Sequence, residues 1–152
     1  MEEKENKVIF GRVADKENLC VIGVSDASYH QGDHSVAGEM LLLGSKTTKM
    51  ATPMYWKSGV IRKVCLSPKA AETRGVVKIV DDGINMANQL SILLKKKVSL
   101  RVFTDLRPLL DSIGSSRQVE EKQIRQLIAY LKPSLEDDNV EEFSWIEGKE
   151  II

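Results

Sequence analysis

Three strand-type stretches follow one another without a helical segment between them, and a long helical stretch comes next. Residues 19–28 (LCVIGVSDAS) are dense in apolar and β-branched side chains, which favours a strand. Residues 36–44 (VAGEMLLLG) predict a second strand, and residues 52–65 contain a third. Strands this close in sequence pair most simply as an antiparallel meander.

The helical stretch begins at Ser67-Pro68, because Ser is favoured at the N-cap and Pro at the first helical position. Apolar residues then recur at helical spacing at Val76, Ile79, Val80, Met86, Ala87, Leu90 and Leu94. Gly75 and Gly83 interrupt the helix at about 1 kcal/mol each relative to Ala. We therefore expect this helix to pack closely on a sheet.

The rest of the chain alternates between the two types of element. Residues 98–104 (VSLRVFT) predict a strand, residues 106–113 a short helix, residues 120–131 a helix with acids in its first turn and Pro133 beyond its end, and residues 143–146 a strand. The order βββ-α-β-α-α-β predicts an α/β fold with a mixed five-stranded sheet and helices on both faces. Residues 1–18 are polar apart from Val8, Ile9 and Phe10, where one short strand is an option, and we interpret them as a lead-in to a domain spanning 19–152.

Composition excludes some classes of protein and leaves others open. The 152 residues carry 22 basic and 22 acidic side chains, and charge balance does not exclude a nucleic-acid enzyme whose charges are segregated. No apolar run approaches the roughly 18 residues of a membrane span. Cys20 and Cys65 lie in apolar stretches, and we expect buried, reduced thiols. A doubly wound nucleotide-binding domain is disfavoured, because no glycine-rich loop follows the first strand.

Three carboxylates occupy positions that are otherwise apolar. Asp26 and Asp105 each end an apolar strand, and Glu72 lies on the buried stripe of the long helix, four residues before Val76. Each acid taken alone could cap a helix or pair with Lys or Arg. Together they favour a site for Mg²⁺, which prefers oxygen ligands, and two such ions promote phosphodiester hydrolysis.

Several short motifs occur in an order that is similar to one known family. They are residues 24–28 (VSDAS) with Gly32-Asp33, residues 56–58 (WKS), residues 64–67 (VCLS) with Ala71-Glu72, residues 103–105 (FTD), Ser116-Arg117 and residues 145–150 (WIEGKE). In this order they resemble YSDADWAGD, WKSKKQ…VALSSTEAE, the CDN strand end, the SR of HSRTKHI and WIPGKENLAD. The chain thus resembles the ribonuclease H-like domain of a copia-type LTR-retrotransposon Pol polyprotein.

The resemblance implies a ribonuclease H fold that cleaves the RNA strand of an RNA–DNA hybrid during reverse transcription. Asp26, Glu72 and Asp105 would be catalytic ligands of two Mg²⁺ ions, for which Mn²⁺ can substitute. The implied partners are the hybrid and the reverse transcriptase domain of the same polyprotein, without a membrane. The implied location is a cytoplasmic virus-like particle or the nucleus.

The chain also departs from the family pattern. Pro68-Lys69 replaces ST, Leu106 replaces the Asn after the third acid, and no KHI follows Ser116-Arg117. The family's fourth acid follows GKENL, whereas this sequence stops at Ile152. We therefore expect a C-terminally truncated domain with weak or no cleavage. The alternative is a non-catalytic RNase H-like module, decayed or domesticated, with a structural or nucleic-acid-binding role.

Three further residues are candidates for substrate contact. Ser28 follows the first acid, Trp56 would stack on a base or ribose, and Arg117 would hold a phosphate. A core position for Trp56 and a solvated loop for Arg117 are the competing interpretations. His30 and His34 are four residues apart in a loop, and we interpret them as surface residues rather than zinc ligands.

Overall fold

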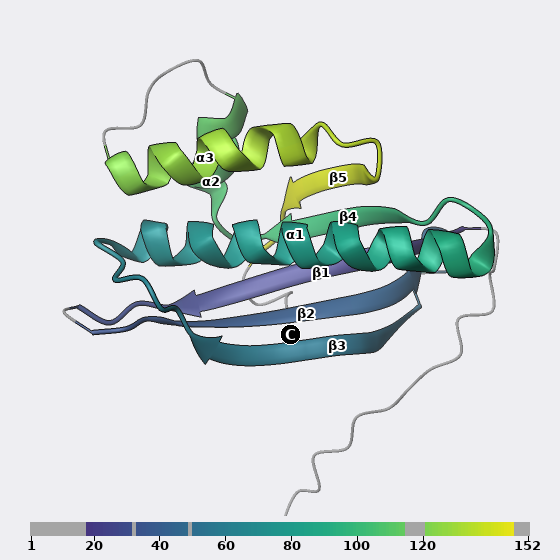
Figure 1. Ribbon diagram of the computed structural model, residues 1–152, viewed down its shortest axis with the longest axis horizontal. Coiled ribbons are helices and arrows are strands. Elements are labelled where there is room, and N and C mark those ends of the chain that lie inside the picture. The colour runs from purple at the N-terminus through teal and green to yellow at the C-terminus, as the bar shows by residue number, and fades with distance from the viewer. Residues whose placement is uncertain (1–17, 32, 49, 115–120, 148–152) are drawn as a thin grey trace, which may run out of the picture.

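The computed structural model describes residues 18–31, 33–48, 50–114 and 121–147. It contains eight elements in the predicted order (Figure 1). They are β1 (Leu19–Ser28), β2 (Val36–Ser45), β3 (Ala51–Val60), α1 (Pro68–Leu94), β4 (Ser99–Thr104), α2 (Arg107–Gly114), α3 (Lys122–Leu135) and β5 (Val140–Trp145). The short strand considered near Val8 lies outside the described residues, as does the first part of the proposed lead-in.

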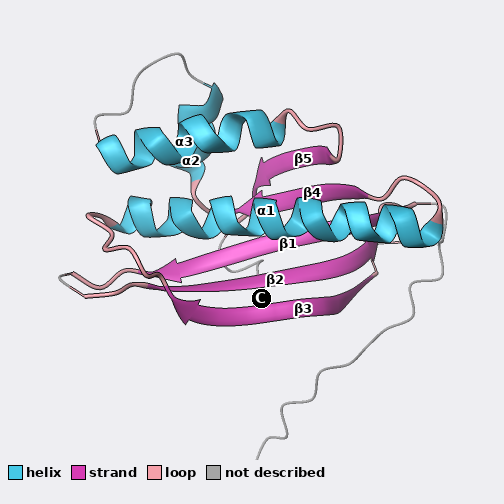
Figure 2. Cartoon of the chain, viewed as in Figure 1, coloured by secondary structure: helices cyan, strands magenta, loops and turns pink. Residues whose placement is uncertain are grey.

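The strands form one mixed sheet in the order β3-β2-β1-β4-β5. The pairs β1–β2 and β2–β3 are antiparallel, which confirms the meander. The pairs β1–β4 and β4–β5 are parallel. Parallel strands need long connections, and α1 supplies the connection from β3 to β4 by running back along one face of the sheet (Figure 2).

The start of α1 is fixed by its own sequence. Ser67 is the N-cap, and its hydroxyl accepts a hydrogen bond from the Ala70 backbone N–H at 3.1 Å. Pro68 is the first helical residue, where it loses no backbone hydrogen bond. The helix ends at Lys95, which adopts a left-handed conformation with φ of 53°. The predicted boundaries of this helix are confirmed.

Close approach between α1 and the sheet explains one of its glycines directly. A side-chain carbon added at Gly83 would lie 2.6 Å from Leu100 Cδ1, and Leu100 is completely buried. Gly75 leaves more room, because an added carbon would lie 3.6 Å from Ser25 Oγ. The packing expectation therefore holds most strongly at Gly83, where a larger residue would displace a core leucine.

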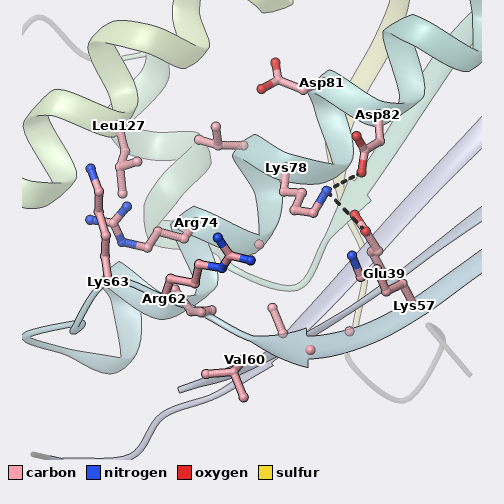
Figure 3. A pocket seen from close by; sticks show the side chains of 16 residues that line it. Glu39, Lys57, Val60, Arg62, Lys63, Arg74, Lys78, Asp81, Asp82 and Leu127 are labelled. Atoms are coloured by element: carbon pink, nitrogen blue, oxygen red, sulfur yellow. Dashed lines mark hydrogen bonds and ion pairs between the residues drawn. The ribbon is translucent and has the colours of Figure 1, made fainter. Parts of the chain in front are cut away.

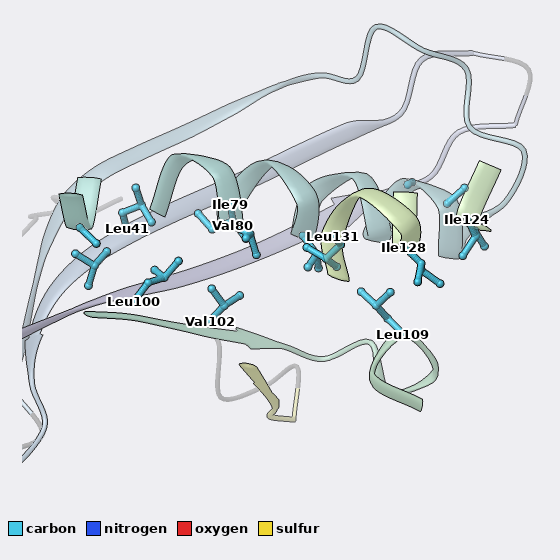
Figure 4. Packing of buried hydrophobic residues seen from close by; sticks show 14 of the residues in the cluster. Leu41, Ile79, Val80, Leu100, Val102, Leu109, Ile124, Ile128 and Leu131 are labelled. Atoms are coloured by element: carbon cyan, nitrogen blue, oxygen red, sulfur yellow. The ribbon is translucent and has the colours of Figure 1, made fainter. Parts of the chain in front are cut away.

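All three helices share one hydrophobic core with one face of the sheet. Side chains from the strands, such as Val102, meet α1 through Ile79, α2 through Leu109, and α3 through Ile128 (Figure 4). Cys20 and Cys65 are buried free thiols, as predicted.

This single helical layer differs from the expected arrangement with helices on both faces. In the part of the chain that the structure describes, α3 packs beside α1, and its buried residues Ile124, Ile128 and Leu131 extend the core that α1 covers. An apolar stripe requires burial, but it does not specify whether a sheet or another helix provides the cover.

The last two elements have different bounds from those predicted. Pro133 lies inside the final turn of α3 rather than beyond it, and Glu121 is the N-cap, so the first turn of α3 contains no acid. The final strand begins at Val140, three residues earlier than expected. Among the described helices, none is both long and apolar enough to cross a membrane.

Candidate carboxylate site

The strand register places Asp26 beside Asp105. In the parallel β1–β4 pair, Val24 lies opposite Phe103. Two residues further along both strands, this register leads to Asp26 at the end of β1 and Asp105 directly after β4. The carboxyl ends of neighbouring parallel strands therefore bring the two predicted aspartates to the same edge of the sheet.

The packing of α1 brings Glu72 to the same edge. An added carbon at Gly23 would lie 3.0 Å from Ile79, and one at Gly75 would face Ser25. The helix thus runs antiparallel to β1, and the next turn back from Gly75 holds Glu72 near the Ala27 backbone. The Ala27 N–H contributes a hydrogen bond that acts on the pKa of Glu72.

Glu72 has the most perturbed acidity in this group. Burial, and then the charges of Asp105 and Asp26, raise the pKa of Glu72 from 4.5 to about 7, and the hydrogen bond from Ala27 partly opposes this shift. Glu72 and Asp105 are half-buried, while Asp26 is exposed. The charges of Asp26 on β1 and Asp105 at the end of β4 therefore reach Glu72 on α1.

The turn after β4 is held by β5. The Trp145 indole N–H donates to the Asp105 carbonyl at 3.0 Å, and the Arg107 guanidinium lies 5.7 Å from the centre of the Trp145 ring. The Thr104 hydroxyl accepts from the Leu106 N–H at 3.1 Å, and the Thr104 carbonyl accepts from the Ile146 N–H. These contacts fix the backbone from which the Asp105 side chain projects.

The carboxylates are hard oxygen donors of the kind that Mg²⁺ prefers. Their side chains are not arranged as a closed metal site: among the described residues, no group of three or more His, Cys, Asp and Glu is close enough to hold an ion. Asp26 Oδ1 instead accepts from the Ala27 N–H at 2.9 Å. The donor set fits a divalent cation chemically, and the ligand roles of the three acids stay a prediction.

The structure places only some of the candidate substrate-contact residues near the carboxylates. Trp56 is 53% exposed on β3, so the core interpretation is wrong. Trp56 and Asp26 line one cavity of about 320 Å³. Ser28 is exposed at the end of β1, and Arg117 lies outside the described residues. His30 and His34 are exposed.

The contacts of Trp145 and Ala27 with the acids of this site are not predicted from the sequence. Trp145 belongs to the WIEGKE motif, and the structure shows that its indole N–H donates to the Asp105 carbonyl. The Ala27 N–H faces two of the acids, Asp26 and Glu72. A tryptophan at the end of a strand is a weak signal, and a backbone donor gives none.

Comparison with known proteins supports the fold through similarity to solved structures and not through sequence matches. No protein-family model matches the sequence, and no curated protein matches it. LC11-RNase H1, isolated from compost by a metagenomic approach, is similar in structure with a TM-score of 0.62, 14% identity and 87% coverage of both chains. RNase H1 from Halobacterium salinarum has a TM-score of 0.59 and 10% identity, over 86% of this chain and 88% of that one.

A retroviral protein also contains this fold. The prototype foamy virus protease–reverse transcriptase matches with a TM-score of 0.51 and 13% identity, over 86% of this chain and 17% of the viral chain. The element order, the sheet topology and these similarities together show that the chain has a ribonuclease H-like fold.

Proposed function

We propose that the chain is the ribonuclease H-like domain of a copia-type LTR-retrotransposon Pol polyprotein, acting as a metal-dependent endonuclease on RNA–DNA hybrids. The observation that carries this proposal is the position of Glu72. It is half-buried on α1, and its pKa is raised to about 7 by burial and by Asp105 and Asp26. Such a group of like charges gains most from a bound cation. A structure of LC11-RNase H1 in complex with an RNA/DNA hybrid supports the choice of substrate.

Asp26, Glu72 and Asp105 would hold two Mg²⁺ ions, or Mn²⁺ in their place. When bound, the ions supply Lewis acidity for the phosphodiester and for the attacking water. The chain itself orients the donors. Trp145 holds the Asp105 carbonyl, and the Ala27 N–H stabilises the charged form of Glu72. Asp26 would turn from the Ala27 N–H toward the ion.

The substrate would lie over the edge where these acids meet. Trp56 would stack on a base or ribose beside Asp26, since both line the same cavity. Ser28 and Arg117 would contact phosphates or sugars. In the polyprotein, the reverse transcriptase domain would deliver the hybrid, within a cytoplasmic virus-like particle or the nucleus.

One observation favours the second candidate function, a non-catalytic RNase H-like module. The described carboxylates do not form a preassembled group of three metal ligands. A module of this kind would keep the fold and bind nucleic acid or another domain without hydrolysis.

Hydrolysis of a hybrid with a labelled RNA strand separates the two functions. In Mg²⁺ or Mn²⁺ we expect slow cleavage by the wild type, no cleavage in EDTA, and a loss of more than about a hundredfold in Glu72→Gln, which removes a ligand charge. Asp138→Asn, in the exposed α3–β5 loop, is the matched control and should cleave like the wild type. Hybrid binding without cleavage in either metal would favour the module.

A further inference from the structure

A cavity of about 570 Å³ lies on the helical side of β2 and β3, and it shares Glu39 and Lys57 with the smaller cavity beside Asp26. Its walls include Glu39 from β2, Arg62 and Lys63 from the loop after β3, Arg74 from α1, and Leu127 from α3. In Figure 3, Arg62, Lys63 and Arg74 gather near Leu127, and Glu39, Lys78 and Asp82 lie together at the other end. We refer to this cavity as the cationic pocket.

The loop that supplies Arg62 and Lys63 is held in place by α3. The Gln123 side chain accepts from the Leu66 N–H at 3.2 Å and donates to the Val64 carbonyl at 3.0 Å. The loop also begins with a hydrogen bond from the Ile61 N–H to the Ser35 carbonyl at 2.7 Å. The cationic pocket is therefore built from fixed elements, and little ordering is needed to receive a ligand.

Positive charge exceeds negative charge in the cationic pocket. Its lining has five basic residues (Lys57, Arg62, Lys63, Arg74 and Lys78) and three acidic ones (Glu39, Asp81 and Asp82). The three acids already have partners. Lys78 lies 3.5 Å from Glu39 and 2.6 Å from Asp82, and the Tyr130 hydroxyl donates to Asp81 at 3.1 Å.

The basic end, in contrast, has few contacts of its own. Across the ranges that the structure describes, the side chains of Arg62, Lys63 and Arg74 form no ion pair or hydrogen bond. The surplus of about two positive charges matches the charge of a phosphate monoester near neutral pH.

Two buried polar atoms at the walls lack hydrogen-bond partners among the described residues. Within that part of the chain, Arg74 Nε is a buried donor without an acceptor, and Glu39 Oε2 is a buried acceptor without a donor. Each such atom is unfavourable in a folded protein unless something satisfies it. A ligand that satisfies both must offer an acceptor oxygen to Arg74 Nε and a hydroxyl or amino donor to Glu39 Oε2.

We propose that the cationic pocket binds a small phosphate monoester of nucleotide size, with its phosphate at Arg62, Lys63 and Arg74 and a hydroxyl or amino group toward Glu39. Guanidinium groups bind phosphate through paired, charge-assisted hydrogen bonds. The volume is within the range of about 300–1,000 Å³ that is usual for small-molecule sites. Val77 and Leu127 provide apolar contact for the rest of the ligand.

The basic end of the cationic pocket is separate from the proposed nuclease carboxylates. Arg74 follows Glu72 by two residues, and at about 100° per residue the two side chains project from nearly opposite sides of α1. A ligand in the cationic pocket therefore neither needs nor replaces metal at the carboxylates.

Calorimetric titration with adenosine 5′-monophosphate, adenosine and inorganic phosphate tests the proposal. We expect the monophosphate to bind at least about tenfold more tightly than adenosine or phosphate alone, since it engages both ends of the pocket. Arg74→Gln and Arg62→Gln should each weaken it about tenfold or more. Lys97→Gln, an exposed lysine far along the chain, and Glu72→Gln should leave binding within about twofold.

The controls keep the proposal falsifiable. Arg62 is exposed, so its variant remains informative even if Arg74→Gln is misfolded by circular dichroism. Monophosphate binding no tighter than adenosine binding, or equal effects of Arg62→Gln and Lys97→Gln, would overturn the proposal. A ten-nucleotide DNA without terminal phosphates that binds in an Arg62-dependent way, when the monophosphate does not, would also overturn it and assign the pocket to a nucleic-acid backbone.

Discussion

Acidic side chains lie in opposite surroundings near the two ends of the neighbouring strands β1 and β4. At the end where both strands begin, Glu141 of β5 lies 2.8 Å from Lys46 Nζ and accepts from the Ser99 hydroxyl at 2.8 Å. Glu142 accepts from Arg101 Nε at 2.6 Å. Each of these acids has a cation supplied by the chain.

At the end where the strands finish, the charges of Asp26 and Asp105 act on Glu72, and none of the three acids forms an ion pair with Lys or Arg among the described residues. The pKa values move in opposite directions. The hydrogen bond from Lys46 lowers the pKa of Glu141, whereas burial and then Asp105 raise the pKa of Glu72. One end is stabilised by its own side chains, and the other would be stabilised by a cation from solution.

The largest effect on stability is expected from breaking the paired end. Arg101→Met removes the partner of Glu142 and the contact of the guanidinium with the Phe103 ring, 5.7 Å away. We expect the free energy of unfolding to fall by about 1–2 kcal/mol, since both groups are partly exposed. Urea unfolding measures this loss. Arg125→Met, at an exposed position on α3, is the control, and an equal loss there would contradict a specific role for the pair.

At the end that holds Glu72, we expect a substitution to raise the free energy of unfolding, not to lower it. In EDTA at pH 8, Glu72→Gln should raise the free energy of unfolding by about 1 kcal/mol, after discounting the pKa shift for the solvent that reaches this side chain. Added Mg²⁺ should then stabilise the wild type more than the variant. Thermal melts in EDTA and in Mg²⁺ measure both effects, and Asp138→Asn is the control.

The raised pKa of Glu72 predicts how the stability of the fold depends on pH. Between about 4.5 and about 7 the folded chain binds a proton at Glu72 that the unfolded chain has lost, so this stability declines as pH rises through that window. The gain from Glu72→Gln should therefore shrink as pH falls from 8 to 5. A variant less stable than the wild type at pH 8 in EDTA would show that the carboxylate is favourably paired.

Much of the fold could be predicted because its elements have strong local signals. The first strand and the Ser67-Pro68 helix start are specified by residues within each segment. Pro133 was misleading as a stop signal, because the last turn of α3 continues through it, with the Glu136 N–H donating to the Lys132 carbonyl at 3.2 Å. The number of helical layers depends on what each apolar stripe meets, which only tertiary packing decides.

The candidate site, like the fold, has residues that local sequence predicts and contacts that only tertiary packing decides. Asp26, Glu72 and Asp105 could be identified because each is an acid at a position that its own element should bury. The contact of Trp145 with Asp105 depends on the register of β5, and the cationic pocket depends on a loop that α3 holds. Neither has a local sequence pattern.

Paramagnetic broadening by Mn²⁺ in amide NMR spectra tests the contrast between the two ends most directly. We expect substoichiometric Mn²⁺ to broaden the amide signals of Ala27, Thr73 and Leu106, next to the three acids, and to leave those of Ser99 and Glu141 sharp. In Glu72→Gln the same broadening should require more Mn²⁺. Selective broadening at Ser99 and Glu141, or uniform broadening at both ends, would contradict the claim that the unpaired carboxylates form the cation site.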